Sequence, residues 1–172
     1  MTIHGEHPFL PPESDRSPVR RFRGRLPSPV GLWTTSYDGR RAGLTVSSMV
    51  VADGEPGHIL GLIDPDSELW EALREAGTAV VSLLGEPHRQ LADAFGYVAP
   101  APGGPFRMAE WTETEWGPAL ASATTWAGCR LVDPAPPELG WSLAVSLEIQ
   151  HVELADDTQP ALVHRRGRYG TA

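Results

Sequence analysis

The chain has 172 residues, which suffices for one domain with a substantial core. Hydrophobic residues make up 41% and charged residues 21% of it, as in ordinary globular proteins, and no run of 18 or more apolar residues predicts a transmembrane helix. All 14 basic residues are arginine, which excludes Schiff-base catalysis and a lysine phosphate clamp. The N-terminus lacks the pattern of a signal peptide and there is one cysteine, so we expect a cytoplasmic protein without an internal disulfide.

Positive charge is concentrated at the start of the chain. The first 26 residues hold five arginines against three acids, whereas the remainder holds nine arginines and 19 acids. An arginine run can bind nucleic acid, but the acidic remainder would repel phosphates, so no nucleic-acid partner is expected. Residues 1–26 show no apolar period, which predicts an extended arm, either solvated or lying on the acidic surface of a partner subunit. We therefore divide the chain into this Arg/Pro-rich arm and one domain, residues 27–172.

The segments after the arm predict a domain that is mainly β with helices. Short apolar runs alternate with turn signals such as Asp38-Gly39. A first helix is predicted to begin at Asp64 and to end at Gly77, and a second spans residues 88–96. This order indicates a β-barrel decorated by helices, without an internal repeat. The expected strands span residues 30–37, 42–51, 58–63, 79–84, 120–132, 139–154 and 161–164.

The usual patterns of catalytic residues are missing. The six histidines include no pair at helical ligand spacing, so a preorganised metal site is not expected. The sequence also lacks a G-x-S-x-G elbow, a phosphate-binding P-loop and a G-x-G-x-x-G motif. Cys129 falls inside an apolar strand, which favours a small core residue over a nucleophile. A nucleotide would have to be held in another way.

One hydroxyl-rich stretch offers such a way. Thr45, Ser47 and Ser48 lie where a strand enters a turn. Ser67 lies in the first turn of the first helix, where unpaired N–H groups and the positive end of the dipole favour a phosphate. Together these residues can hold a ribityl chain and a phosphate. From the residues alone, the alternative stays open that they suit a half-exposed strand and that Ser67 only caps the helix.

The order of these pieces resembles a known family. The run from Pro29 to Gly39, followed by Gly43-Leu44-Thr45-Val46-Ser47-Ser48, is similar to the opening of the flavin reductase-like, FMN-binding split-barrel family. The resemblance continues in register to the closing segment around Tyr169 and covers roughly residues 28–170. It implies a six-stranded split β-barrel, usually a homodimer, that binds flavin mononucleotide (FMN) without a covalent bond near the subunit interface.

By position, the resemblance also implies which residues bind the cofactor. Residues 45–48 would line the flavin and its ribityl chain, Asp64 and Ser67 would lie near the phosphate or the pyrimidine edge, and Phe95 near the ring system. No catalytic residue is implied, because the flavin itself accepts the hydride. The implied cofactor-binding residues are Thr45, Val46, Ser47, Ser48, Asp64, Ser67 and Phe95.

The activity that the resemblance implies is reduction of flavin by NADH or NADPH, often for a partner monooxygenase. Family members often carry Gly-Asp-His before the penultimate strand, with the histidine associated with the nicotinamide, but here the sequence reads Gly140-Trp141-Ser142. Trp141 can stack on a second ring in its place. A glutamine common at the start of the second helix appears as His88. Two alternatives therefore stay open: a non-catalytic flavin-binding electron carrier or sensor, and a site for FAD or a deazaflavin.

Overall fold

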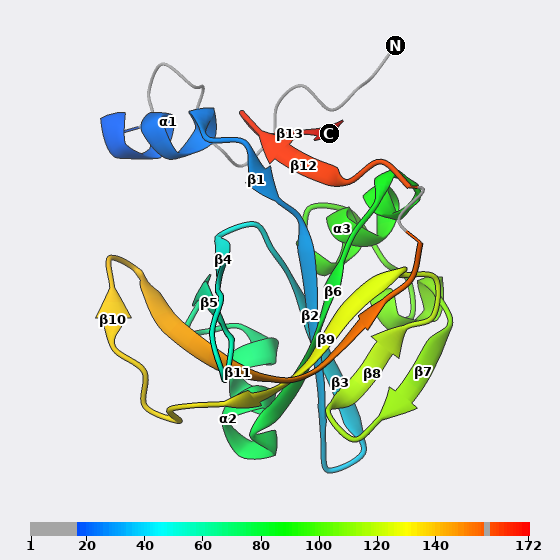
Figure 1. Cartoon of the computed structure of the whole chain (residues 1–172). Helices are drawn as coiled ribbons and strands as arrows, with labels where there is room; N and C mark the ends of the chain where they lie inside the picture. The colour runs from blue at the N-terminus through cyan, green and yellow to red at the C-terminus, as the bar shows by residue number, and fades with distance from the viewer. Residues whose placement is uncertain (1–16, 157–158) are drawn as a thin grey trace.

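One curled antiparallel sheet dominates the computed structural model, which describes residues 17–156 and 159–172 (Figure 1). The order of the strands along the sheet is β3-β2-β6-β9-β11-β5-β4, and the short β10 pairs with β11. The expectation of a mainly β fold with helices is confirmed. The strands of this sheet are β2 (Gly31–Tyr37), β3 (Arg40–Val46), β4 (Met49–Ala52), β5 (His58–Ile63), β6 (Thr78–Leu83), β9 (Thr125–Leu131), β10 (Glu138–Leu139) and β11 (Ser142–Leu154).

In the described part of the chain, two smaller sheets, three α-helices and two short 3₁₀ helices (η2 and η3) surround the curled sheet (Figure 1). One small sheet has the order β1-β12-β13 and the other is the β7–β8 hairpin. Within the described part of the chain, no helix has both the length and the apolar character needed to cross a membrane. The remaining elements are α1 (Pro18–Arg25), β1 (Ser28–Pro29), α2 (Glu68–Ala76), η2 (Glu86–His88), α3 (Arg89–Phe95), η3 (Pro105–Met108), β7 (Trp111–Thr114), β8 (Gly117–Leu120), β12 (Leu162–Arg165) and β13 (Arg168–Thr171).

The sequence predicted an extended arm over residues 1–26, and for residues 18–25 that prediction is wrong. These residues form α1, which buries none of its side chains. The hydroxyl of Ser17 accepts a hydrogen bond from the Arg20 N–H, and Pro18 occupies the first turn, where its missing N–H costs nothing. Local capping thus forms a helix that has no apolar period. Residues 1–16 lie outside the described residues, and the division between arm and domain stays a prediction.

A single strand was expected over residues 42–51, but the structure divides it at Ser47 and Ser48. Before this break, β3 pairs with β2, with Val46 opposite Gly31. After it, β4 pairs with β5, with Met49 opposite Gly61. Because β3 and β4 stand at opposite ends of the strand order, two residues join the two ends of the sheet. The sheet must therefore curl into a barrel, and we call Ser47 and Ser48 the link.

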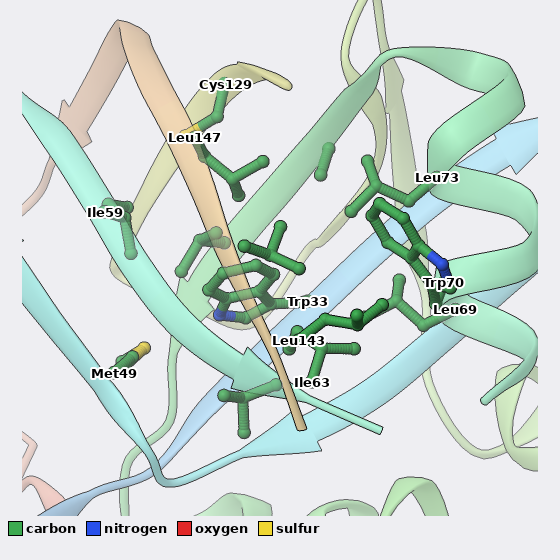
Figure 2. Packing of buried hydrophobic residues seen from close by; sticks show 14 of the residues in the cluster. Trp33, Met49, Ile59, Ile63, Leu69, Trp70, Leu73, Cys129, Leu143 and Leu147 are labelled. Carbon is green, nitrogen blue, oxygen red and sulfur yellow. The ribbon is translucent and has the colours of Figure 1, made fainter. Parts of the chain in front are cut away.

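The interior of the curl is apolar and receives side chains from every strand on the main path through the sheet. Trp33 of β2 is fully buried at its centre, and α2 closes one end with Leu69 and Leu73 (Figure 2). Gly61 is required here, because a Cβ at this position would lie 2.7 Å from the Trp33 ring. The close fit of Trp33 on Gly61 fixes how tightly β5 approaches β2.

A second apolar cluster lies against α3 and the β7–β8 hairpin. Phe95 is fully buried in it and makes edge-to-face contacts with Phe106 and Trp111, at centroid distances of 4.9 and 5.8 Å. A Cβ at Gly43 would lie 2.8 Å from the Phe95 ring, so α3 packs closely against β3. This cluster holds the end of β3, and with it the link, from outside the curl.

Candidate functional site

The link lies beside the end of β5. The Leu62 N–H donates to the Ser48 carbonyl at 2.9 Å, and the Ser48 hydroxyl donates to the Leu62 carbonyl at 3.0 Å. These bonds place Ser47 and Ser48 next to Asp64, which follows two residues after Leu62. The structure therefore brings together two parts of the predicted site that are separated by 16 or more positions in the sequence.

The link is supported by three of the predicted site residues, Thr45, Val46 and Phe95. The Thr45 hydroxyl donates to the Ala92 carbonyl of α3 at 2.7 Å. The side chains of Val46 and Phe95 are buried in the two apolar clusters, with 4% and 0% of their surface exposed. Neither side chain is exposed in the single chain, and Phe95 packs against β3 at Gly43. Direct contact of either side chain with a cofactor stays a prediction.

Helix α2 starts at the same place. It begins at Glu68, not at Asp64 as the sequence predicted, because Ser67 supplies the N-cap. The Ser67 hydroxyl accepts from the Trp70 N–H at 3.2 Å and donates to the Asp64 carbonyl at 2.7 Å. Asp64 instead closes the turn before the helix, where its carboxylate accepts from the Asp66 N–H at 2.9 Å. The capping role that the sequence left open for Ser67 is thus what the structure shows.

Carboxylates surround this helix start. Four exposed acids, Asp64, Asp66, Glu68 and Glu71, lie within or just before the first turn of α2, and we call them the acidic rim. The segment 61–73 contains no arginine. The fit to FMN is therefore uneven. The hydroxyls and backbone of the link suit a ribityl chain and the polar edge of a flavin ring, whereas the rim opposes a phosphate dianion.

Tyr97 lies near the start of α2, which the sequence did not reveal. It follows α3 in a left-handed conformation, with φ of 56°, where glycine is the usual residue. Burial raises the pKa of its hydroxyl, and the Glu68 carboxylate raises it further by charge and by accepting its hydrogen bond. Tyr97 thus connects the end of α3 to the start of α2. In the sequence, Tyr97 is marked only by its position as a non-glycine residue directly after Gly96, which ends α3.

Trp141 lies at the edge of the same region. It forms the tip of the β10–β11 turn with Gly140, and 96% of its surface is exposed. Leu143 pairs with Ile63, so the turn lies beside the residues that follow β5. A fully exposed tryptophan is available to stack on a planar ligand. The position is compatible with the stacking role predicted for Trp141.

His88 belongs to a different surface. It lines a hollow of about 450 Å³ together with Glu110, Ser122 and Gln159. The Gly85 N–H donates to His88 Nδ1 at 3.0 Å, so Nε2 carries the proton and donates to the Ser122 hydroxyl, also at 3.0 Å. Burial lowers the pKa of His88, which keeps the ring neutral. The Ser122 hydroxyl accepts this hydrogen bond, so His88 does not act on it as a base.

Cys129 is confirmed as a core residue. It is fully buried, and burial raises the pKa of its thiol to about 12, so no thiolate forms near neutral pH. In residues 17–156 and 159–172, no group of three His, Cys, Asp or Glu side chains is placed to hold a metal ion.

Comparisons with known proteins agree with this geometry. An FMN reductase (NADH) RutF 1 of Methylorubrum extorquens is 36% identical over 119 residues, which are 69% of this chain and 59% of the relative. A reductase component of 4-nitrophenol 4-monooxygenase/4-nitrocatechol 2-monooxygenase from Rhodococcus opacus is 29% identical over 157 residues, covering 91% of this chain and 80% of the relative. The chain thus spans just under three fifths of the length of the RutF relatives of Methylorubrum extorquens.

Solved structures establish the fold. The NADH:FAD oxidoreductase SgcE6 of Streptomyces globisporus superposes with a TM-score of 0.80 at 21% identity, covering 95% of this chain and 96% of that chain. A flavin reductase domain protein from Arthrobacter sp. FB24 gives 0.79 at 19% identity, covering 90% and 93%. The expected split β-barrel is confirmed. The family model of the flavin reductase like domain matches residues 23–172, and the chain therefore belongs to this family.

Proposed function

We propose that the chain is an NAD(P)H-dependent flavin reductase that binds flavin, with FMN as the expected form, without a covalent bond. The observation that carries this proposal is that the link lies beside the start of α2. This place is the seam of the barrel, where β3 and β4 bring the two ends of the sheet together. The relatives named FMN reductase (NADH) support both the flavin and the hydride donor. NADPH stays an equal candidate, since none of the described residues at the site separates the two nucleotides.

The link would hold the flavin by its polar edge and ribityl chain. Ser47 is half-buried in the two-residue connection, while the hydroxyls of Thr45 and Ser48 are held by backbone carbonyls. Both of these hydroxyl oxygens can still accept a hydrogen bond from a ligand. Val46 would contribute through its backbone. Asp64 and Ser67 would lie near the pyrimidine edge, and Phe95 would keep β3 in place.

The protein's task in this reaction is to position two rings. A bound flavin supplies a ring that accepts a hydride and spreads the charge, so the chain needs no acid–base residue for that transfer. What the residues must do is hold the flavin at the link and leave one face open for the nicotinamide at about 3–3.5 Å. Trp141, exposed at the edge of the site, would stack on one of the two rings and shield the pair from water.

A second copy of the chain would complete the site. The outward face of β4 and β5 carries Val50 and Leu60, which pair with each other and are 62% and 39% exposed. This face continues to Ser48 and Leu62 at the link. Apolar side chains gathered on one face of a sheet are typical of an interface. The expected homodimer would therefore bury this face and place the flavin near the junction of the two subunits.

Delivery of reduced flavin to a partner monooxygenase completes the proposal. The Rhodococcus opacus relative is named as the reductase component of a monooxygenase, which supports this role. The cytoplasmic location expected from the sequence fits it as well. Among the described residues, no surface identifies the partner enzyme.

Two measurements test the proposed function. Mass spectrometry of the supernatant from denatured protein, purified or incubated with flavins, should show which flavin binds. Anaerobic addition of NADH or NADPH should then remove the absorbance of the oxidised flavin within turnover times. A flavin spectrum that neither nucleotide changes would instead favour the electron carrier that the Trp141-Ser142 replacement left open. Absence of any flavin would refute flavin binding altogether.

A further inference from the structure

Helix α1 leaves a stripe of apolar side chains uncovered. Val19, Phe22 and Leu26 are 78%, 69% and 52% exposed. Their spacing of three and four residues places them on one side of the helix, and at 3.6 residues per turn Arg23 and Arg25 lie on either side of this stripe. Apolar side chains that gather on one face of a surface element are typical of an interaction site. The stripe therefore indicates a partner surface that the described part of the single chain does not supply.

Hydrogen bonds hold α1 in a fixed place. The Arg166 N–H donates to the Gly24 carbonyl at 2.6 Å, and Arg165 Nε donates to the Arg25 carbonyl at 3.2 Å. These bonds anchor the end of α1 to the turn between β12 and β13. In Figure 1 the helix stands apart from the curled sheet and extends on the side of the view where β4, β5 and β10 lie. Its side chains are thus presented beyond the sheet from a defined base.

The charges of α1 complement those of the β4–β5 hairpin. Residues 17–26 hold four arginines and no acid, whereas residues 42–73 hold six acids and no arginine. Within the described part of the chain, no carboxylate forms an ion pair with any arginine of α1. The turn of the hairpin exposes Asp53 and Glu55. Opposite charges on two surfaces favour their association and fix its orientation.

A hollow beside this turn can receive apolar side chains as well. It has a volume of about 480 Å³ and lies between the turn and residues 149–152 of β11. Val51, Pro56 and Val152 line it together with the two carboxylates of the turn. Val51 and Val152 are 66% and 48% exposed. The hollow thus offers apolar walls next to negative charge, which matches an apolar stripe flanked by arginines.

The small size of the outward face of β4 and β5 points to a second copy of the chain as the partner of α1. The two strands have four and six residues, and only alternate residues face outward. A stable interface takes about 800 Å², or roughly 20–30 residues, from each partner. The face around Val50 and Leu60 is therefore too small to hold a homodimer alone. In a two-fold dimer, a helix that reaches the other subunit does so twice, so α1 would enlarge the interface on both sides.

We propose that α1 of each subunit packs on the β4–β5 hairpin of a second copy of the chain, with its apolar stripe over the hollow and its arginines against Asp53 and Glu55. This inference rests on the homodimer of the proposed function and names a contact that holds it together. The contact continues the face of β4 and β5 across the junction of the two subunits. Because it joins exposed charges of different chains, it weakens on dilution and when salt screens the charges.

The test uses two charge-reversed variants of the full chain. Arg23→Glu/Arg25→Glu places carboxylates against the hairpin, and Asp53→Arg/Glu55→Arg places arginines against α1. Each variant alone should dimerise at least about tenfold more weakly than the unmodified chain, because like charges then meet across the contact. Mixed in equal amounts, the two variants should dimerise with each other at nearly the original strength, because both contacts of the mixed dimer pair opposite charges. Analytical ultracentrifugation measures all of these dissociation constants.

The matched control is Arg20→Glu/Arg21→Glu, which makes the same change in net charge on the opposite side of α1. It should weaken the dimer far less than Arg23→Glu/Arg25→Glu does. Equal weakening by these two variants would overturn the inference, and so would charge-reversed variants that dimerise no better when mixed. The mixture also identifies the contact as one between chains, since a contact within one chain would stay broken in both variants.

The remaining outcomes separate this inference from the proposed function. A dimer that no variant weakens overturns the contact while the homodimer stands, and an unmodified chain that stays monomeric overturns both. If no flavin binds, the proposed activity fails, but the contact is still measured, because ultracentrifugation needs no flavin. Binding of the unmodified chain to vesicles of anionic lipid, together with a dimer that charge reversal leaves unchanged, would assign α1 to a membrane surface and overturn the inference.

Discussion

The interior of the curled sheet and the region around the link are built from the same strands but from opposite kinds of residue. Inside, Trp33 and Leu147 have none of their surface exposed, and the cluster around them is apolar throughout. At the link, hydroxyls and carboxylates lie at or near the surface, and their partners are mostly backbone groups. The interior sets how the barrel closes, whereas the proposed function assigns ligand binding to the link and the start of α2. Changes in the two regions should therefore have separable effects.

The largest expected effect is on the interior. Trp33→Ala should lower the free energy of unfolding by about 3–5 kcal/mol, because it removes a fully buried ring and leaves a cavity against Gly61. Urea denaturation followed by circular dichroism measures this. The matched control is Trp141→Ala, which removes the same side chain from an exposed turn and should change stability by no more than about 0.5 kcal/mol. Equal losses of stability in the two variants would contradict the expected difference between interior and surface.

Changes at the link should act on binding more than on stability. Ser47→Ala combined with Ser67→Ala should weaken flavin binding by about 1–3 kcal/mol, through lost hydrogen bonds to the ligand. Because Ser67 is the N-cap of α2, the double variant should also lose about 1 kcal/mol of stability, whereas Ser47→Ala alone should lose little. Fluorescence titration and thermal melting separate the two contributions. Unaltered flavin affinity in the double variant would remove both serines from the site.

A change on the outward face of β4 and β5 is expected to have an effect of intermediate size. Leu60→Glu should leave the fold intact, because this side chain is exposed in the single chain, but it should weaken the proposed homodimer by at least about tenfold, or 1.4 kcal/mol. Size-exclusion chromatography with light scattering reports the change. Val132→Glu, at an exposed position just after β9, serves as a comparison for the added charge. A monomeric unmodified chain, or a variant dimer of unchanged strength, would show that this face is not the interface.

The smallest expected effect is the dependence of stability on pH. Burial lowers the folded-state pKa of His88, and burial followed by the charge of Arg23 lowers that of His164, with Asp93 acting in the opposite direction. Since the unfolded chain binds these protons first, stability is fully present above the ordinary histidine pKa of 6.5 and decreases as pH falls below it. Thermal melting from about pH 7.5 down to pH 5 should show this decrease. His88→Gln should flatten part of the curve, and an identical curve would exclude His88 as a contributor.

The sequence predicted those elements whose patterns are local. Strand β5 and the β2–β3 hairpin were readable from alternation and from Asp38-Gly39. The break at the link was not, because β-prone residues continue from Leu44 to Val51 and only the closing of the sheet separates them. The β7–β8 hairpin was not predicted, because its turn contains Glu115 and Trp116 in place of the usual hairpin residues.

The candidate site was only partly predictable. Hydroxyls at 45–48 and at Ser67 could be recognised as a group because a family shares their order. Their present hydrogen-bond partners depend on how Ala92 and Leu62 approach in space, which no local pattern encodes. The start of α2 was misplaced because Asp64 and Ser67 are both good capping residues, and only the bonds formed decide between them. Tyr97 follows α3 and lies near Glu68 at the start of α2, and sequence spacing does not reveal this proximity of the two helices.

The two-residue connection between β3 and β4 has a mechanical consequence. Since it spans the seam of the barrel, its length cannot change without letting the two ends of the sheet drift apart, and an insertion here would be far less tolerated than one in an ordinary surface turn. A ligand bound across the seam would make contacts on both sides of it. Its binding free energy would then add to the cost of local opening, so amide hydrogen exchange in β3 and β4 should slow when flavin is present. In this fold, a flavin bound at the link would therefore also stabilise the closed barrel.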